Sequence, residues 1–367
     1  MPPSEISPQR TPIARLLAVA CVAAAVASPA SGQRQVAYVS LQEEGRVAAY
    51  SIDEGSGAWS LLQTVDAGAG AGPMALSPDG RRLAVAIRDA NGAVTLDIGD
   101  DGRLTLLGSQ DIGGSSPYIA FDRTGRWLLA AYYADGKVSV HRIDEQGRIA
   151  AGPVQEIATN PNAHAVVMDA SNRFLFVPHT GANAIHQFRF DEASGTLTPN
   201  QQSAVHTPEG TGPRHLIIHP HLDFAYAINE TASTITAYRF DRESGTLEEA
   251  QSVPTLPEDF GGRSTTADIH VTPDGRFLYG SNRGHDSIVA YAIDPASGEL
   301  TRIGWFETEQ TPRSFALDTS GRFLYAAGQG SDRVAAYEID SGSGALKHLA
   351  TYDVGGAPTW IAIVALE

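Results

Sequence analysis

The sequence predicts an all-β protein, a seven-bladed β-propeller formed as one domain by residues 33–367. Two repeated patterns lead to this prediction. A strand–turn–strand segment recurs along the chain, as in "ALSPDGRRLAVA", "AFDRTGRWLLAA" and "HVTPDGRFLYGS". A turn rich in Asp, Ser and Gly lies about 20 residues further on, as in "DEASGTLT" and "DPASGELT". Self-similarity of this kind indicates a repeat architecture rather than a set of unrelated elements.

Each repeat contains four short antiparallel strands within about 45–50 residues, which is typical of a propeller blade. The first two strands flank the turn of the strand–turn–strand segment. A third strand follows with visible alternation of apolar and polar residues, as in "SIVAYAID". The Asp/Ser/Gly cluster then supplies residues that tolerate positive φ angles, which the hairpin turn before the fourth strand requires. No useful length of helical periodicity is found after residue 32.

The number of blades follows from the innermost strands, which line the channel of a propeller. We expect them to begin near seven positions: Gly72, Pro117, His164, Arg214, Ala267, Arg313 and Thr359. The N-terminal end contributes three strands without an innermost one ("VAYVS", "GRVAAYSI" and "WSLLQTV"), and the C-terminal end contributes only an innermost strand ("PTWIAIVAL"). The sequence therefore predicts a 3+1 closure of the terminal blade, which joins the chain ends and removes exposed sheet edges.

Residues 1–32 differ in composition from the rest. Arg10 and Arg15 precede the apolar run "LLAVACVAAAVA", and the small residues "SPASG" follow it. This order is typical of a secretory signal peptide, with a cut after Ala30 or Gly32. The apolar run is shorter than the roughly 20 residues that cross a membrane, so we expect no membrane span. The predicted location is the periplasm or the outside of the cell.

Composition excludes several classes of function. The formal net charge is −16, the calculated pI is about 5.0 and no run of Lys or Arg occurs, so nucleic-acid binding is not expected. Cys21 is the one cysteine and would leave with the signal peptide, although a lipoprotein anchor through Cys21 is an alternative reading of the same segment. The mature chain then has no disulfide, no cysteine nucleophile and no cysteine-bound zinc. We expect a monomer.

Alignment of the repeats on their first turn predicts which side chains meet at one mouth of the channel. His164, Arg214 and Arg313 occupy one position, the first residue of the innermost strand. A second position, just after the second strand, holds Glu230 and Arg283. The other blades carry at this second position Gln42, Asp89, Tyr133, Thr180 and Gln329. Both positions open on the same face, so the five residues should surround one funnel.

Three arginines around a narrow channel point to binding of an anion or polarisation of a carbonyl group. Simpler interpretations stay open, since Arg214 and Glu230 would also make an ordinary ion pair across one hairpin. His164 would equally serve as a structural histidine. Asp268 and His270 alternate within "TADIHVT" and are interpreted as a hydrogen-bonded support.

The sequence predicts neither a metal nor an organic cofactor. The segment "HLIIHPH" offers His215, His219 and His221, but the last two fall in a turn at the opposite face of the propeller. No fourth ligand has a suitable spacing for a zinc site.

The segments "GPRHLIIHPHLDFAYAINETASTI", "TADIHVTPDGRFLYGSNRGHDSI" and "TPRSFALDTSGRFLYAAGQGSDRVAAYEID" resemble the bacterial propeller-type 6-phosphogluconolactonases of the lactonase family. The resemblance extends from "QVAYVS" to "APTWIAIV", essentially the whole mature chain. It implies that the catalytic histidine of the family falls on His164, its acid/base glutamate on Glu230 and its arginines on Arg214 and Arg283. The candidate substrate-binding residues are Arg313, Asp268 and His215.

The resulting hypothesis is hydrolysis of a small sugar-type lactone without a metal. Glu230 or His164 takes a proton from the attacking water, the other protonates the departing ring oxygen, and arginines stabilise the oxyanion. Lactonases of this type are cytoplasmic whereas residues 1–32 predict export, so we expect an unphosphorylated sugar lactone or another small lactone. Two alternatives are a lactonising isomerase that acts on a muconate-like dicarboxylic acid, and a secreted propeller that binds a protein or glycan without catalysis.

Overall fold

The computed structural model describes Met1 and residues 34–366. The predicted signal peptide and its cleavage site therefore lie outside the described residues, Met1 apart, and stay predictions. No helix within the described part of the chain is long and apolar enough to cross a membrane.

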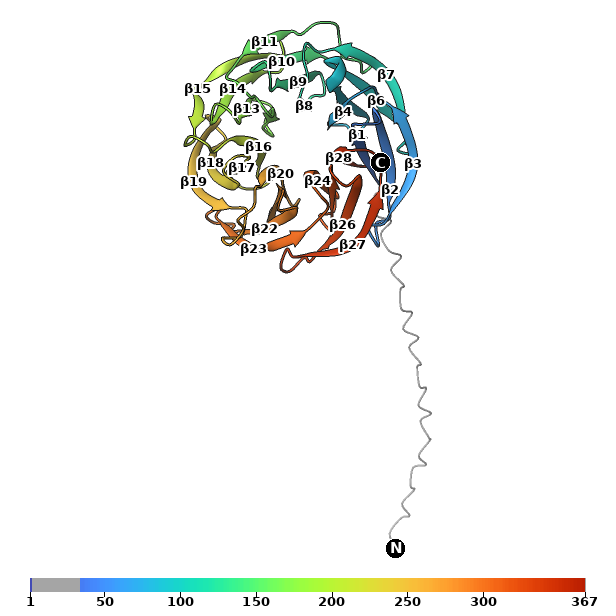
Figure 1. The fold of residues 1–367 in the computed structure, drawn as a ribbon, viewed down its shortest axis with the longest axis vertical. Helices are drawn as coiled ribbons and strands as arrows, with labels where there is room; N and C mark the ends of the chain where they lie inside the picture. The colour runs from blue at the N-terminus through green and yellow to red at the C-terminus, as the bar shows by residue number, and fades with distance from the viewer. Residues whose placement is uncertain (2–33, 367) are drawn as a thin grey trace. The chain divides into compact units, whose positions relative to one another are not determined.

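Residues 35–365 form seven four-stranded antiparallel sheets, which surround a central channel as the blades of a propeller (Figure 1). This confirms the predicted fold class. From the innermost to the outermost strand, the blades are β28 (Pro358–Ala365), β1 (Gln35–Leu41), β2 (Arg46–Ile52), β3 (Trp59–Asp66); β4 (Ala71–Leu76), β5 (Arg82–Ile87), β6 (Gly92–Ile98), β7 (Leu104–Asp111); β8 (Tyr118–Phe121), β9 (Trp127–Tyr132), β10 (Lys137–Arg142), β11 (Gln155–Ala158); β12 (Val167–Met168), β13 (Phe174–His179), β14 (Ala184–Asp191), β15 (Thr196–His206); β16 (Pro213–Ile218), β17 (Phe224–Asn229), β18 (Thr234–Asp241), β19 (Thr246–Pro254); β20 (Thr265–Val271), β21 (Phe277–Arg283), β22 (Ser287–Ile293), β23 (Leu300–Glu307); and β24 (Pro312–Leu317), β25 (Phe323–Gly328), β26 (Arg333–Ile339), β27 (Leu346–Asp353).

The terminal blade closes as predicted, because β28 pairs antiparallel with β1. The Oγ of Ser40 on β1 and the Oγ1 of Thr359 on β28 add a side-chain hydrogen bond of 3.0 Å. The backbone N–H of Leu366 donates to the carbonyl of Arg34 at 2.7 Å, so the pairing continues to the end of the described chain. The first and last strands of the propeller are thus held in one sheet. Each pairs with the other along an edge that would otherwise be exposed.

The blades hold one another through a contact that recurs around the ring. A tyrosine on the second strand of one blade donates its hydroxyl to the carbonyl of a glycine in the Asp/Ser/Gly turn of the next blade. The four pairs are Tyr38–Gly102 at 3.0 Å, Tyr226–Gly298 at 2.9 Å, Tyr279–Gly344 at 2.9 Å and Tyr325–Gly57 at 2.8 Å. The two sequence patterns that define the repeats therefore meet between blades: the strand pattern supplies the tyrosine and the Asp/Ser/Gly turn supplies the glycine.

Only glycine fits this turn. Gly344 has a φ of 73°, in the left-handed region, and a Cβ added there would lie 2.4 Å from the Phe277 ring of the preceding blade. A side chain at this position would strain the backbone and push the two blades apart.

A β-bulge at the start of an innermost strand directs a side chain toward the channel. In β16, Pro213 pairs with Asn229 and His215 pairs with Ile228, so Arg214 between them has no residue opposite. The same shift in β24 leaves Arg313 unopposed. Bulges of this kind re-aim side chains and are frequent beside active sites.

We predict that Tyr279→Phe lowers the free energy of unfolding by about 1 kcal/mol, because it removes the hydroxyl from a buried carbonyl. Gly344→Ala should cost about 2 kcal/mol or more, since it adds backbone strain to a steric clash. Urea unfolding followed by tryptophan fluorescence measures both. Gly342→Ala in the same turn is the matched control, because its Cβ would meet only the Asp340 side chain, at 3.4 Å. Equal losses in the two alanine variants would contradict this account of the turn.

Candidate active site

A cavity of about 170 Å³ lies where the predicted polar residues converge. Its lining comes from six of the seven blades and consists of Arg88, Pro117, Tyr133, His164, Arg214, Glu230, Arg283 and Arg313. All five residues that the repeat alignment placed around one funnel are among them. Four arginines and one glutamate make this the cationic part of a chain whose formal net charge is −16.

Arg214 is the most buried charge of the cavity, with 1% of its surface exposed. One terminal nitrogen of its guanidinium donates to the carbonyl of Ala267 and, at 3.0 Å, to Nε2 of His215. Its Nε lies 3.4 Å from a carboxylate oxygen of Glu230, within ion-pair distance. Burial and the nearby cations Arg313 and Arg283 lower the pKa of Arg214, but a guanidinium stays charged at neutral pH.

His215 and Asp268 lie behind Arg214 and are not among the residues that line the cavity. Nδ1 of His215 donates to Asp268 at 2.9 Å, which leaves Nε2 to accept from Arg214. Burial, more than any neighbouring charge, lowers the pKa of His215 to about 4, so the imidazole is neutral near pH 7. The sequence assigned both residues to substrate binding, whereas their contacts in the structure hold Arg214 in place.

Asp268 also accepts backbone N–H bonds from Ile269 at 3.0 Å and Phe315 at 3.2 Å, and its second oxygen lies 3.3 Å from Nε2 of His270. Burial alone would raise the pKa of Asp268, but His270 and His215 hold it well below its usual value. The interpretation of Asp268 and His270 as a hydrogen-bonded support agrees with these contacts.

Glu230 joins two arginines at the mouth of the cavity. Its carboxylate accepts a hydrogen bond of 2.7 Å from Arg283 and faces Nε of Arg214 on the other side. Arg283 donates in addition to the carbonyl of Thr266 at 2.8 Å. Burial opposes ionisation of Glu230, yet Arg214 and Arg283 keep its pKa below the usual value. Glu230 is therefore a carboxylate at neutral pH, and it pairs with two arginines of the cavity rather than with one across a surface hairpin.

His164 enters the cavity from just before the short innermost strand β12. Its ring lies 5.2 Å from that of His215 and 5.7 Å from that of Tyr133, and only 4% of the residue is exposed. Its Nδ1 is buried and has no hydrogen-bond partner among the described residues. Burial and the positive charge of Arg214 lower the pKa of His164 well below 6.5. The neutral imidazole is able to accept a proton.

Arg313 and Arg88 complete the cationic wall. Burial, Arg283 and Arg88 lower the pKa of Arg313 to about 10. Within the described chain, neither Arg313 nor Arg88 makes an ion pair with a carboxylate. Arg88 was not among the predicted residues, because the repeat alignment placed Asp89 at the equivalent position. Arg88 directly follows Ile87, which pairs with Ala71, just as Glu230 directly follows Asn229, which pairs with Pro213. The connection from β5 to β6, which contains the 3-10 turn η1 (Arg88–Ala90), has the usual length. The alignment was therefore one residue too far along the chain, and counting from the end of β5 was the available signal.

Aromatic rings from three innermost strands meet next to the cavity. Tyr118 of β8 packs edge-on against Trp360 of β28, with ring centroids 5.3 Å apart, and against His215 of β16 at 5.2 Å. Trp360 lines a recess of only about 10 Å³ that shares Arg214 and Arg313 with the cavity. The rings therefore pack beside the arginines and leave little free space in this recess.

The histidines at the far turn have a structural role. Nε2 of His219 lies 2.8 Å from the carbonyl of Gly275, and Nε2 of His221 lies 2.9 Å from that of Pro273. Both tie the turn after β16 to the turn of the next blade. Among the described residues, no group of three or more His, Cys, Asp or Glu side chains is arranged to hold a metal ion.

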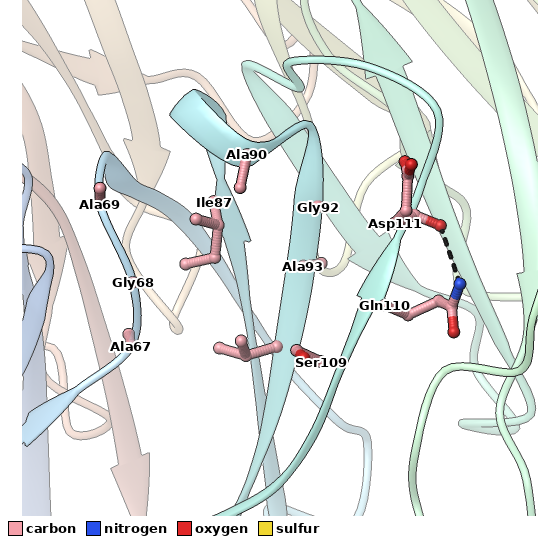
Figure 2. A pocket seen from close by; sticks show the side chains of 11 residues that line it. Ala67, Gly68, Ala69, Ile87, Ala90, Gly92, Ala93, Ser109, Gln110 and Asp111 are labelled. Carbon is pink, nitrogen blue, oxygen red and sulfur yellow. Dashed lines mark hydrogen bonds between the residues drawn. The ribbon is translucent and has the colours of Figure 1, made fainter.

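A larger cavity of about 320 Å³ lies between the β3–β4 loop, the β5–β6 turn and strands β6 and β7 (Figure 2). Figure 2 shows mostly small side chains there, such as Ala67, Ala69 and Ala93. Its one ionisable residue is Asp111, whose carboxylate accepts the backbone N–H of Gly113 at 2.7 Å. This cavity contains none of the predicted site residues and offers no acid–base pair, so the smaller arginine-lined cavity is the candidate active site.

Comparison with protein families gives a match over residues 30–363 to the model described as "Lactonase, 7-bladed beta-propeller". The 6-phosphogluconolactonase of Serratia proteamaculans is 37% identical over 332 residues, which cover 90% of this chain and 99% of that protein. The 6-phosphogluconolactonase of Yersinia pestis is 36% identical over 330 residues, 90% of this chain and 98% of that protein.

Solved structures are similar over the same part of the chain. A periplasmic gluconolactonase of Pseudomonas aeruginosa superposes with a TM-score of 0.84 at 27% identity, covering 92% of this chain and all of that one. A Lactobacillus plantarum protein gives a TM-score of 0.82 at 23% identity over 91% of this chain and all of that one, which shows a shared fold.

We predict that Asp268→Asn lowers the free energy of unfolding at pH 7 by about 1–3 kcal/mol, because it weakens the buried acceptor that holds His215 and Arg214. The folded-state pKa of Asp268 lies below that in the unfolded chain, so the carboxylate stabilises the fold above about pH 4. That contribution is lost as the pH falls toward the folded-state pKa, and the difference from the parent protein should then narrow.

Denaturant unfolding at pH 7, 5 and 3 tests this dependence. Asp66→Asn is the control, because the Asp66 side chain is 86% exposed and pairs with Arg46 at the surface. Loss of such a surface ion pair should lower the free energy of unfolding by only about 0.5 kcal/mol. A deficit for Asp268→Asn that is as large at pH 3 as at pH 7 would rule out the ionised carboxylate as its cause.

Proposed function

We propose that this chain, which belongs to the lactonase family of seven-bladed β-propellers, hydrolyses a small sugar-type lactone in the arginine-lined cavity. The observation that carries the proposal is the meeting of a neutral histidine, an ionised glutamate and four arginines in one cavity. The match to 6-phosphogluconolactonases along nearly their whole length supports the reaction class.

The protonation states favour His164 as the base. Glu230 and His164 are both unprotonated at neutral pH, so neither is ready to donate a proton at the start. The group that takes the proton from water must therefore supply it to the departing ring oxygen. Nδ1 of His164 has no hydrogen-bond partner among the described residues, whereas the carboxylate of Glu230 is occupied by Arg214 and Arg283.

The steps balance without a further reactant. His164 accepts a proton as the water oxygen bonds to the ring carbonyl carbon, and the carbonyl oxygen becomes an oxyanion. Arg214, Arg283 and Arg313 stabilise that negative charge, which at such sites is usually the largest catalytic contribution. The bond from the carbonyl carbon to the ring oxygen then breaks, and protonated His164 gives its proton to the ring oxygen. The product is the open-chain hydroxy acid.

The cavity also links the base to the oxyanion. The positive charges around His164 lower its pKa in the free protein, and negative charge developing on the substrate offsets them. The affinity of His164 for a proton therefore rises as water attacks. Glu230 keeps Arg214 and Arg283 in position and limits their mutual repulsion, which makes it a positioning residue in this mechanism.

We further propose that the protein is exported and cut near Ala30 or Gly32. The order of charged, apolar and small residues in the first 32 positions supports this. The Pseudomonas aeruginosa gluconolactonase of the same fold is described as periplasmic. An exported enzyme would meet unphosphorylated lactones.

We predict that His164→Asn lowers kcat by about 10²-fold or more, the usual contribution of general acid–base catalysis. Glu230→Gln and Arg214→Ala should each lower kcat at least about tenfold, since both disturb the oxyanion-binding arginines. Initial rates on gluconolactone, followed by proton release in weak buffer, measure all three. Circular dichroism and thermal melting verify that the variants fold.

Glu249→Gln and Arg142→Gln are matched controls, because both residues are exposed and lie on strands away from the cavity. They should keep the parent rate. Parent-like turnover in folded His164→Asn would contradict the assignment of the base. Absence of hydrolysis of any sugar lactone by the parent protein would contradict the proposed function.

We predict that kcat/KM is independent of pH through pH 6.5 and falls only in more acidic solution. The base must be unprotonated, and its folded-state pKa is depressed, so activity is lost as the pH falls through that lowered pKa. Arg313→Gln removes one of the charges that depress the pKa of His164, so the acidic limb should move to higher pH.

Stopped-flow or pH-stat rates between pH 4 and pH 8 give the profile. Glu230 would respond to Arg313→Gln in the same direction, so His164→Asn separates the two groups: its residual activity should lack the displaced limb. A limb that stays in place in Arg313→Gln would contradict the electrostatic coupling.

A further inference from the structure

A second, wider space of about 480 Å³ adjoins the catalytic cavity. It lies between the turn after β17 and the β19–β20 loop. Its lining residues are Thr231, Ala232, Ser233, Leu256, Gly262, Arg263, Ser264, Thr265 and Arg283. We call it the outer groove.

Arg283 connects the outer groove with the catalytic cavity, because it lines both. Thr265 pairs with Arg283 in the sheet, and Thr231 directly follows Glu230. A substrate whose carbonyl lies against Arg283 in the inner cavity therefore has the outer groove as its neighbouring space.

The loop that forms the outer wall is anchored at both ends. The carbonyl of Thr255 accepts hydrogen bonds from Trp305 Nε1 at 2.7 Å and from Asn282 at 3.0 Å. At the other end, Ser264 Oγ donates to the carbonyl of Arg283 at 3.0 Å. Gly284, with a φ of 101°, packs so closely that a Cβ would lie 2.4 Å from the carbonyl oxygen of Arg263. The backbone at Arg263 is thus held against the turn that follows β21.

The chemistry of the lining suits an anion with hydrogen-bonding oxygens. Thr231 and Thr265 supply hydroxyl groups, whereas those of Ser233 and Ser264 already donate to backbone carbonyls. The nine lining residues include two arginines and no carboxylate. Arg263 is exposed, and no described residue forms an ion pair or side-chain hydrogen bond with its guanidinium. An exposed guanidinium beside hydroxyl groups matches the geometry of carboxylate and phosphate oxygens.

Size also favours a substrate that extends beyond the inner cavity. The catalytic cavity, at about 170 Å³, is smaller than the roughly 300–1,000 Å³ of typical small-molecule sites. The catalytic cavity and the outer groove together fall within that range.

We propose that the outer groove is a subsite for a second, anionic group of the substrate, and that Arg263 determines the preference for charged over neutral sugar lactones. The inference rests on the proposed lactonase function and names its substrate class: a sugar lactone that carries a carboxylate or a phosphate beyond the ring. Because the protein is proposed to be exported, a carboxylate is the expected group.

Three lactones test the subsite: neutral gluconolactone, carboxylate-bearing glucarolactone and 6-phosphogluconolactone. The parent protein should hydrolyse at least one charged lactone with a kcat/KM about tenfold or more above that for gluconolactone. In Arg263→Gln, kcat/KM for that lactone should fall about ten- to a hundredfold, mainly through KM, because one charge-assisted contact is lost. Its rate on gluconolactone should stay within about twofold.

Arg263→Lys should recover part of the loss, since it restores the charge without the planar fork. Arg142 is an exposed arginine on a distant blade, so Arg142→Gln is the matched control. It should leave kcat/KM unchanged for the charged lactone and for gluconolactone. Glucarolactone and 6-phosphogluconolactone distinguish the two sources of the anion. Equal kcat/KM for all three lactones, or an equal loss on gluconolactone in Arg263→Gln, would overturn the subsite and leave the lactonase function standing. Failure of all three lactones in the parent protein would instead overturn the function on which the subsite rests.

Discussion

The site depends on the burial of one charge, the guanidinium of Arg214. Taking such a group out of water costs several kcal/mol unless it is paired and hydrogen-bonded. The compensation comes from the carbonyl of Ala267, from neutral His215 and from Glu230, three contacts that reach it from two adjoining blades. His215 in turn needs Asp268 to hold its proton on Nδ1. The catalytic cavity is thus the exposed end of a buried polar network, and the blade spacing that the ring enforces is what keeps the network in register.

The same network sets the protonation states that the chemistry uses. Four arginines against one glutamate leave excess positive charge in a nearly closed space, and the pKa of His164 is lowered as a consequence. Glu230 is held ionised by the neighbours that it holds in place. An anion that enters therefore does two things at once: it neutralises the repulsion among the arginines and it increases the basicity of His164. Binding and activation of the base are parts of a single electrostatic event.

The sequence was sufficient for the fold because turn chemistry and strand alternation are local. The seven innermost strands and the two unequal chain ends predicted seven blades and their 3+1 closure, and the structure has both. Alignment of the repeats also brought His164, Arg214, Glu230, Arg283 and Arg313 to one mouth. Alignment was less informative about three other features of the site. Arg88 was missed because the alignment placed Asp89, the next residue, at the position that Arg88 occupies. The contact between His215 and Asp268 joins two blades, 53 positions apart, and no single repeat reveals it. The bulge at Arg214 depends on backbone pairing and has no side-chain pattern.

Function is concentrated where the repeats differ from one another. All blades share the tight turns, and four share the tyrosine–glycine contact, so these positions are accounted for by the ring itself. At the entry to the innermost strand the backbone repeats, but the side chain changes from Gly72 to Arg214 to Arg313. The repeat therefore fixes the backbone at this position but not the side chain. The β19–β20 loop extends this reasoning. It is tied to the scaffold at its two ends and through Phe260, whose ring packs edge-on against His285 at 4.7 Å, and it carries Arg263 in the outer groove. In a scaffold made of near-identical blades, we expect substrate preference to come from the residues that differ between blades. Two such features, Arg283 and the β19–β20 loop, line the outer groove together, and Arg283 also lines the catalytic cavity.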